Sequence, residues 1–201
     1  MGVARVTDFV RHLLSMRPEE FGPSTVGRLL ADVSFGTDEV DPYCSFKPKT
    51  YTRNLIFRNE DFEVAVMCWD AAATTPIHDH GGQQCWMTAI RGTFDVQNYE
   101  RIIGGWREGV AGLAHVDTSS AIRRGEPDYR FRENDIHRVC VSPREESAVS
   151  LHVYAKPLTS CLIYDLETKS CAQTALDYDR VAVDEFSLVS LNRPKAKEKV
   201  F

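Results

Sequence analysis

Three histidines have the residue type and the spacing of metal ligands. His78 and His80 are separated by a single residue, so on an extended chain both imidazoles point to the same side. The pair is followed by Gly81 and Gly82, which allow a sharp turn and bring the backbone close to a ligand. A third candidate, His137, stands further along the chain. Pairs of this kind also occur as surface histidines without a function, so the spacing alone indicates only a candidate site.

The chemistry open to such a site depends on the metal. Three neutral imidazoles on one side of a metal leave the opposite positions free for ligands. Zinc held in this way activates a water molecule. Non-haem iron oxygenases usually replace one histidine by a carboxylate. Without that carboxylate Fe²⁺ keeps its full charge, which favours an anionic ligand such as a thiolate. The histidines by themselves therefore permit zinc, iron or no metal. We expect no role in the site for His12 and His115.

The elements that position these residues follow from the hydrophobic pattern. Apolar residues with helical spacing predict two helices, within 9–14 and 24–33. From about residue 51 the period changes to two, which predicts short strands. Helices followed by many strands predict a mainly β fold, a sandwich or barrel with an N-terminal helical cap. The expected strands are 51–57, 62–69, 85–90, 93–99, 136–141, 148–154 and 160–164. No element is assigned to 109–131, and 179–201 is expected to pack loosely over the barrel.

The size and composition of the chain limit its class. A length of 201 residues suits one domain, with a helical cap at about 1–40, a barrel at about 45–170 and a C-terminal extension at 175–201. A net charge of −5 without a long basic tract argues against nucleic acid as a partner. No apolar run approaches the roughly 20 residues that span a membrane.

The first residues and the cysteines suggest a cellular compartment. Charged residues interrupt the apolar positions of 1–16, so we expect no secretory signal there. The six cysteines contain no Cys-X-X-Cys pair, which favours reduced thiols over a disulfide framework. We therefore expect a cytoplasmic protein, without a membrane partner, that acts as a monomer. The basic stretch 193–199 is expected to be a solvated tail.

The neighbours of the histidines resemble a known pattern. In the first cupin motif a His-X-His pair is followed by a glutamate and then by a glycine. Here Cys85 stands at the glutamate position and Gly92 at the glycine position. His137 begins another predicted strand, as the second cupin motif requires. The proline and glycine expected just before it are replaced by 132–134, Arg-Glu-Asn. The resemblance implies a small cupin-type, jelly-roll-like β-barrel.

Over 51–165 the chain resembles the cysteine dioxygenases more specifically. Four blocks of sequence occur in the same order as in that family, and their residue types match those of the family. They are Tyr-Thr-Arg-Asn-Leu at 51–55, Cys-Trp at 68–69 leading into Ile-His-Asp-His at 77–80 and Cys85, Ile-His-Arg-Val at 136–139, and Ala-Val-Ser-Leu-His-Val-Tyr at 148–154 running on to Cys161. The N-terminal helices and the residues after 165 match weakly.

The resemblance implies roles for the matching residues. His78, His80 and His137 correspond to the family's three ligands of Fe(II). Arg53 corresponds to the arginine that binds the substrate carboxylate, since a planar guanidinium can make two parallel charge-assisted hydrogen bonds. Tyr51 corresponds to a tyrosine that lines the same pocket.

A second group of residues is implied to support the reaction. Tyr154 corresponds to the tyrosine whose hydroxyl helps to place the substrate and O₂. Ser150 and His152 alternate with it along one strand, so the three side chains share a face, and in the family they form a hydrogen-bonded relay. Cys85 corresponds to the cysteine that forms a thioether cross-link to that tyrosine. An inert buried thiol is the alternative for Cys85.

The resemblance implies an enzyme that adds both atoms of O₂ to the thiol of L-cysteine and yields a sulfinic acid. The nearest alternative is a related enzyme for another small thiol, 3-mercaptopropionate or mercaptosuccinate. Arg53 favours cysteine, because relatives specific for 3-mercaptopropionate tend to carry glutamine there. Gln83, Gln84 and Trp86 could reshape the pocket. Two other classes remain open, a three-histidine zinc hydrolase or lyase and a cupin that senses a thiol or metal without turnover.

Overall fold

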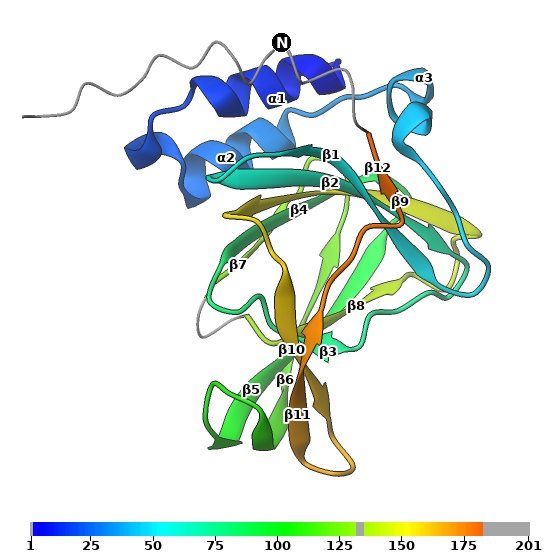
Figure 1. Ribbon diagram of the computed structural model, residues 1–201. Coiled ribbons are helices and arrows are strands. Elements are labelled where there is room, and N and C mark those ends of the chain that lie inside the picture. The colour runs from blue at the N-terminus through cyan, green and yellow to red at the C-terminus, as the bar shows by residue number, and fades with distance from the viewer. Residues whose placement is uncertain (1, 132–134, 183–201) are drawn as a thin grey trace, which may run out of the picture.

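The computed structural model describes residues 2–131 and 135–182 (Figure 1). The chain begins with helices and continues with strands, as the hydrophobic pattern predicts. The helices are α1 (Val6–Ser15), α2 (Pro23–Ala31) and α3 (Thr37–Val40), with short 3-10 turns at Pro18–Glu20 and Asp41–Tyr43. None of the helices in these described ranges combines the length and the apolar character needed to cross a membrane.

Within 2–131 and 135–182, twelve strands follow the helices, and they form two sheets. The first sheet has the order β12-β1-β2-β9-β4-β7, and the second closes into a ring with the order β10-β11-β6-β5-β8-β3. The bounds are β1 Tyr51–Arg58, β2 Phe62–Asp70, β3 Ile77–His78, β4 Gln84–Arg91, β5 Phe94–Gly104, β6 Gly109–Ile122, β7 Asp128–Arg130, β8 His137–Val141, β9 Ser147–Ala155, β10 Ser160–Asp165, β11 Ser170–Ala175 and β12 Arg180–Val181.

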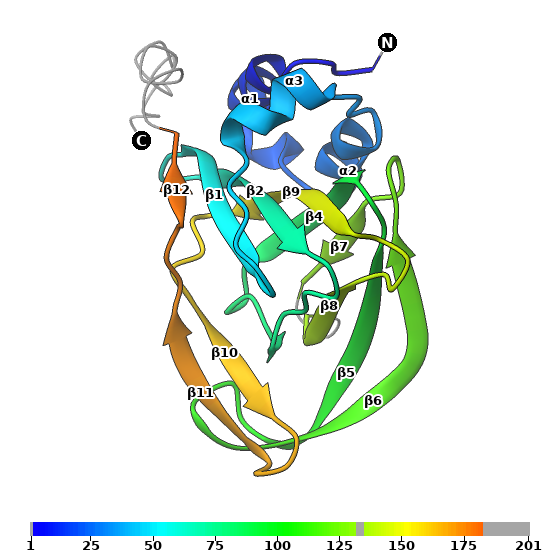
Figure 2. The ribbon, with the colours of Figure 1, turned by 90° about the vertical axis from the view of Figure 1, so that its right-hand side faces the viewer.

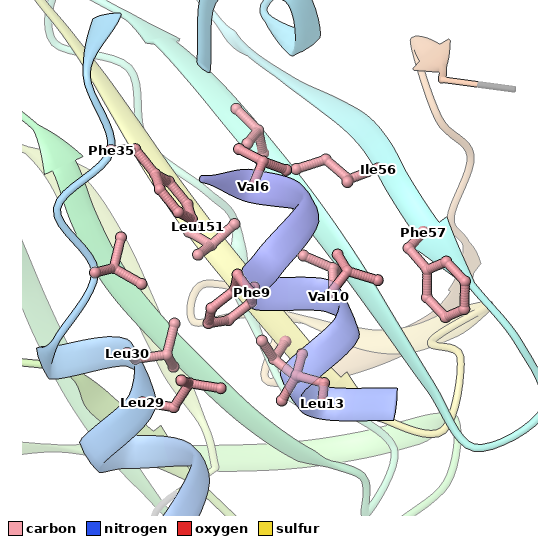
Figure 3. Close-up of a cluster of buried hydrophobic side chains, with 14 of the residues drawn as sticks. Val6, Phe9, Val10, Leu13, Leu29, Leu30, Phe35, Ile56, Phe57 and Leu151 are labelled. Carbon is pink, nitrogen blue, oxygen red and sulfur yellow. The ribbon is translucent and has the colours of Figure 1, made fainter. Parts of the chain in front are cut away.

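The helices cover the outer face of the first sheet, above β1, β2, β9 and β4 (Figures 1 and 2). Alternate residues of these strands point outwards and pack against the apolar faces of α1 and α2. Phe9 and Leu13 of α1 meet Ile56 and Leu151 of the sheet in one buried cluster (Figure 3). Because Phe9 is fully buried, its replacement by alanine is expected to cost about 4 kcal/mol of stability.

The inner faces of the same strands form a wall of the barrel interior. Along β9 the outward residues Val149, Leu151 and Val153 belong to the cluster under the helices, whereas Ala148 and Tyr154 belong to a second, interior cluster. The central strands are therefore buried on both faces, and their inward positions are free to carry polar side chains that face a cavity. The functional residues of the wall lie at these inward positions.

The expected fold class is confirmed, a mainly β fold with a barrel and N-terminal helices. Two regions hold more structure than the sequence indicated. The unassigned stretch 109–131 contains β6 and β7, and β11 and β12 follow the last expected strand. The basic stretch 193–199 lies outside the described residues. All six cysteines lie within the described ranges, where none forms a disulfide.

Candidate metal centre

The three candidate histidines come together in the barrel. His78 and His137 are direct cross-strand partners in the antiparallel pair β3–β8, and His80 follows β3 by one turn residue. Their ring centroids are 4.5 to 5.3 Å apart. One nitrogen from each ring lies within 4.8 Å of the other two, so a single metal ion fits between them. The group is therefore a candidate metal centre.

Each imidazole is held through its Nδ1 atom. The Nδ1 of His78 is 3.1 Å from the carbonyl oxygen of Pro76, and the Nδ1 of His137 is 2.6 Å from that of Asp135. The Nδ1 of His80 is 2.5 Å from a carboxylate oxygen of Asp135. When Nδ1 donates to an oxygen, the lone pair of the neutral ring is on Nε2. The three rings therefore present Nε2 as the metal-binding atom.

Asp135 is a residue of the site that the sequence analysis missed. Its second carboxylate oxygen also accepts the backbone N–H of His80 at 2.8 Å, so one side chain fixes both the ring and the main chain of that residue. Together with its carbonyl bond to His137, Asp135 orients two of the three ligands. Such outer partners are a regular part of metal sites. An acidic residue two positions before the third histidine was the available signal.

Asp79, between the first two histidines, fixes the turn that carries them. Its carboxylate accepts the N–H of Gly81 at 3.1 Å, the N–H of Leu162 at 3.0 Å and the hydroxyl of Tyr164 at 2.8 Å. The turn itself needs glycine, because φ is +58° at Gly81 and +79° at Gly82. The bonds to β10 join the turn to the strand that pairs with β3.

Burial and neighbouring charges set the protonation of the ligands. Burial lowers the pKa of His78 to about 4 and that of His137 well below its usual value, with repulsion from the other imidazoles adding to the effect. Both rings are therefore neutral near pH 7, as metal ligands must be. For His80 burial lowers the pKa, but Cys85 and the Asp135 carboxylate outweigh it and raise the value to about 10. A metal ion would displace that proton on binding.

The opposite wall of the cavity comes from the first sheet. A chain of hydrogen bonds runs along its inner face. Trp69 Nε1 donates to the hydroxyl of Ser150 at 2.8 Å, Ser150 Oγ lies 2.8 Å from His152 Nε2, and His152 Nδ1 lies 3.3 Å from the hydroxyl of Tyr154. The ring of His152 stacks on that of Tyr154 with an interplanar angle of 15°. The structure thus brings together the three residues that were expected to form a relay.

One direction of hydrogen bonding is open along the whole relay. Indole N–H can only donate, so the Ser150 oxygen accepts from Trp69 and its own hydrogen is free for His152 Nε2. Burial lowers the pKa of His152 well below its usual value, so the ring is neutral and carries one proton. In the tautomer in which Nε2 accepts from Ser150, that proton is on Nδ1 and is donated to the Tyr154 oxygen. The hydroxyl hydrogen of Tyr154 then remains available to the cavity.

Arg53 lies at an inward position of β1, and its side chain is 7% exposed. Its Nη2 is 3.4 Å from Glu63, and its guanidinium lies 5.9 Å from the ring of Tyr154 and 5.0 Å from that of Tyr178. Nε and Nη1 are buried and have no hydrogen-bond partner among the residues that the structure describes. Buried guanidinium N–H groups without a partner are costly, so these two are suited to an anionic ligand.

A second arginine borders the cavity, and the sequence analysis did not name it. Arg130 of β7 is held by both oxygens of Asp128, at 2.5 and 3.1 Å, and by Asn98 at 2.5 Å. Its charge is therefore balanced by a partner carboxylate. Arg53 is the better candidate for binding a ligand, because two of its nitrogens have no such partner in the described ranges.

Cys85 and Tyr154 stand side by side. They are direct partners in the register of β4 and β9, which places their Cβ atoms about 4.5–5.5 Å apart by the usual spacing of such pairs. Both are 3% exposed. Tyr51, also at an inward position of β1, stacks on Trp69 with centroids 4.8 Å apart and lines the same cavity. Every site residue expected from the sequence thus lies on one of the two walls.

The cavity between the walls is small and mostly apolar outside these groups. It measures about 50 Å³, and the three histidines, Arg53 and Tyr154 all line it. A wider cavity of about 700 Å³ adjoins it, sharing His80, Leu158 and Cys161 and bordered by the Gly81–Gly82 turn. The cavity of about 50 Å³ at the histidines has the size for a small molecule and not for a macromolecular substrate.

The chain was compared with protein families and with known proteins. The family model described as cysteine dioxygenase type I matches residues 4–167, well over half of the chain. Cysteine dioxygenase type 1 from human and from rat is 28% identical over 127 residues, which is 63% of this chain and 61% of the relative. The zebrafish protein is 28% identical over 129 residues with the same coverage.

Solved structures give weaker similarity. The protein TT1209 from Thermus thermophilus shares 15% identity over 58% of this chain and 93% of that chain, with a TM-score of 0.44. KdgF from Halomonas sp. shares 12% identity over 57% and 84%, with a TM-score of 0.42. The evidence for the family is therefore the sequence match over residues 4–167. The three-histidine group is consistent with that match. This chain belongs to the cysteine dioxygenase type I family.

Proposed function

We propose that this protein is an iron-dependent dioxygenase that adds both atoms of O₂ to the thiol of L-cysteine to give cysteine sulfinic acid. The observation that carries the proposal is the placement of Arg53 across one small cavity from three histidines. A metal for the thiol and a cation for the carboxylate would then be available within the reach of one small amino acid.

The ligand set fits ferrous iron. Two of the three imidazoles are neutral near pH 7, all three are oriented through Nδ1, and their ligand atoms lie within 4.8 Å of one another. With neutral ligands only, Fe²⁺ would keep its charge and favour a thiolate. When bound, iron would lower the pKa of the thiol and supply the redox chemistry with O₂.

The protein's own residues would position the substrate. Arg53 would bind the carboxylate through N–H groups that have no partner among the described residues. With its carboxylate at Arg53 and its thiol at the metal, cysteine would be held in one orientation. This would reduce the entropic cost of bringing the reacting atoms together. The wall of buried side chains would exclude water from the reacting atoms.

Tyr154 would act as a hydrogen-bond donor during oxygen transfer. With its oxygen accepting from His152 Nδ1, 3.3 Å away, its own hydrogen would point towards charge that develops on the transferred oxygen. Burial raises the pKa of Tyr154 well above its usual value, which keeps the phenol protonated. Trp69, Ser150 and His152 would hold this orientation from behind.

We also propose that Cys85 and Tyr154 can form a thioether cross-link. The bond would join the sulfur of Cys85 to a ring carbon of Tyr154, with loss of two hydrogen atoms, so O₂ would be needed as oxidant. The direct cross-strand pairing of the two residues and the family's chemistry support this step. The cross-link would fix the phenol on the side of the cavity where its hydroxyl is needed.

The aligned part of the chain spans only 61% of the length of the human relative. The identity of the substrate therefore does not follow from that similarity, and we propose L-cysteine from the site. 3-Mercaptopropionate and mercaptosuccinate also carry a thiol and a carboxylate, and a test must include them.

Together with the family, the unpaired state of the six cysteines supports a cytoplasmic enzyme, and we propose that one chain forming one domain is the active unit.

The test is an oxygen-uptake assay. Protein loaded with Fe²⁺ is mixed with each of the three thiols, and the product is analysed by mass spectrometry. We expect uptake to be fastest with L-cysteine and the product to carry two additional oxygen atoms. Faster uptake with another thiol would replace the proposed substrate. Zinc in the purified protein, with no uptake for any thiol, would favour a hydrolase or lyase.

A further inference from the structure

The segment 176–182 lies beside the arginine of the cavity. It follows β11 and ends with β12, which pairs in parallel with β1, where Asn54 meets Arg180 and Leu55 meets Val181 (Figures 1 and 2). The family match ends at residue 167, so nothing in that match assigns a role to this segment. Its contacts with Arg53 involve both the main chain and the side chain.

Asp179 holds the main chain of Arg53. The backbone N–H of Arg53 donates to the Asp179 carboxylate at 2.9 Å, and the N–H of Asp179 donates to the carbonyl of Arg53 at 2.8 Å. The other carboxylate oxygen of Asp179 accepts from Lys47 at 2.5 Å, on the exposed side. Asp179 thus joins the segment to the residue of β1 that faces the cavity.

Tyr178 holds the side chain of Arg53. Its ring lies 5.0 Å from the guanidinium, within cation–π distance, and its hydroxyl donates to Glu63 at 2.5 Å. Glu63 is fully buried, and its other oxygen is 3.4 Å from Arg53 Nη2. Tyr178 and Glu63 therefore contact the guanidinium from one side, and neither residue lines the cavity of the metal centre.

We propose that the segment 176–182 forms part of the substrate-binding site, with Tyr178 and Asp179 as positioning residues that hold Arg53 ready for the carboxylate of a small thiol. The inference rests on the proposed function, in which Arg53 binds that carboxylate. Arginine has a long, flexible side chain, and fixing it before binding removes an entropic cost that the ligand would otherwise bear. The substrate class that follows is thiols with a carboxylate.

The experiment compares two thiols that differ in the carboxylate. L-cysteine and cysteamine are titrated into the Fe²⁺-loaded protein without O₂, and binding is measured by calorimetry. The wild-type protein and Arg53→Lys come first. The proposed function predicts that the wild type prefers L-cysteine and that the preference is about tenfold smaller in Arg53→Lys, which keeps the charge but loses the planar pair of donors. Equal binding of the two thiols by the wild type, or no binding, would contradict the role of Arg53 itself.

The segment is then tested in the same way. Tyr178→Ala is expected to weaken L-cysteine binding about tenfold and to leave cysteamine unchanged, because the loss of a buried cation–π contact is of that size. Tyr178→Phe keeps the ring and loses only the bond to Glu63, so a change of about threefold is expected. Asp179→Ala should resemble Tyr178→Ala. Lys47→Ala, the matched control, removes only the exposed partner of Asp179 and should bind both thiols normally.

The effect must also depend on Arg53. In an Arg53→Ala protein, Tyr178→Ala should cause no further loss of L-cysteine affinity, because the guanidinium that Tyr178 contacts is then absent. Equal weakening of both thiols, or the same loss with and without Arg53, would show a general structural role and overturn the inference. If Tyr178→Ala lowers the melting temperature too far, Tyr178→Phe decides, and unchanged cysteine affinity in Tyr178→Phe would overturn it.

Discussion

The two walls of the cavity differ in how far their polar groups are already hydrogen-bonded. On the histidine wall every Nδ1 has an acceptor, from Pro76 or from Asp135. On the opposite wall Arg53 keeps two nitrogens without a partner among the described residues, and the Tyr154 hydroxyl is 3.3 Å from His152. The first wall is complete before a ligand arrives, whereas the second has bonds left to make. A wall with satisfied hydrogen bonds suits a permanently bound metal, and a wall with unpaired donors suits a substrate that binds and leaves.

The walls also differ in where their supports lie in the sequence. The acceptors of the His78 and His137 rings are two residues away from them along the chain. The supports of Arg53 come from Glu63, on the next strand, and from Tyr178 and Asp179, more than a hundred residues later. The rings of His78 and His137 are therefore oriented by local contacts, whereas Arg53 is held by contacts that the tertiary fold provides. A change to one wall should therefore leave the other wall intact.

The largest effect is expected from removing a ligand on the histidine wall. His137→Ala should abolish metal binding and activity, because two imidazoles remain and a structural or catalytic site needs three or four protein ligands. Metal content is measured by mass spectrometry of the purified protein. His12→Ala is the control, since His12 is exposed on α1. A His137→Ala protein with normal iron content would exclude the proposed ligand set.

A smaller effect is expected from the support of that wall. Asp135→Ala removes the acceptor of the His80 ring and of its backbone N–H, and it leaves the three ligand residues in place. Metal affinity should fall by about 10- to 100-fold, as is usual for such partners. Competition with a chelator gives the affinity. Unchanged affinity would mean that the imidazoles need no orientation from Asp135. The hydrogen bonds already formed on the histidine wall would then not explain its metal binding.

On the substrate wall, Arg53→Lys keeps the charge and loses the planar pair of donors. The KM for L-cysteine should rise about tenfold, with iron content unchanged, because one charge-assisted hydrogen bond is of that size. Steady-state oxygen uptake at varied cysteine concentration provides the measurement. Lower iron content in this variant would show that the walls are coupled and cannot be described separately.

The smallest effect is expected from Cys85→Ser. The cross-strand pair with Tyr154 then cannot form a thioether, while the phenol keeps its bond to His152. Activity should fall by about two- to tenfold, which corresponds to the net contribution of one hydrogen bond. A denaturing gel should show a doublet for the wild type and a single band for Cys85→Ser. A single band for both proteins would show that no cross-link forms.

The sequence predicted the parts of the site whose signals are local. The spacing of His78 and His80, the alternation of Ser150, His152 and Tyr154 along one strand, and the four blocks of family resemblance all lie within short stretches. The same holds for α1 and α2 and for the central strands β1, β2, β4 and β9 of the first sheet. These elements agree with the structure because local pattern and tertiary fold favour the same conformation there.

Other parts could not be predicted because their causes are distant. β6 is long but its alternation is weak, and it pairs with β5 through two irregularities in register. Asp135 gains its role only when β8 is placed beside β3. The contacts of Glu63, Tyr178 and Arg53 join three strands or segments that no local pattern connects. Such contacts arise from the pairing of distant segments, which sequence periodicity does not describe.

The measurement that tests the central claim most directly combines both walls. The Fe²⁺-loaded protein is given L-cysteine and ¹⁸O₂, and the product is analysed by mass spectrometry. We expect cysteine sulfinic acid in which both new oxygen atoms are ¹⁸O, with one O₂ consumed for each cysteine. A product with oxygen from water, or no product while iron remains bound, would contradict the account of a metal centre and an arginine that act together on one thiol.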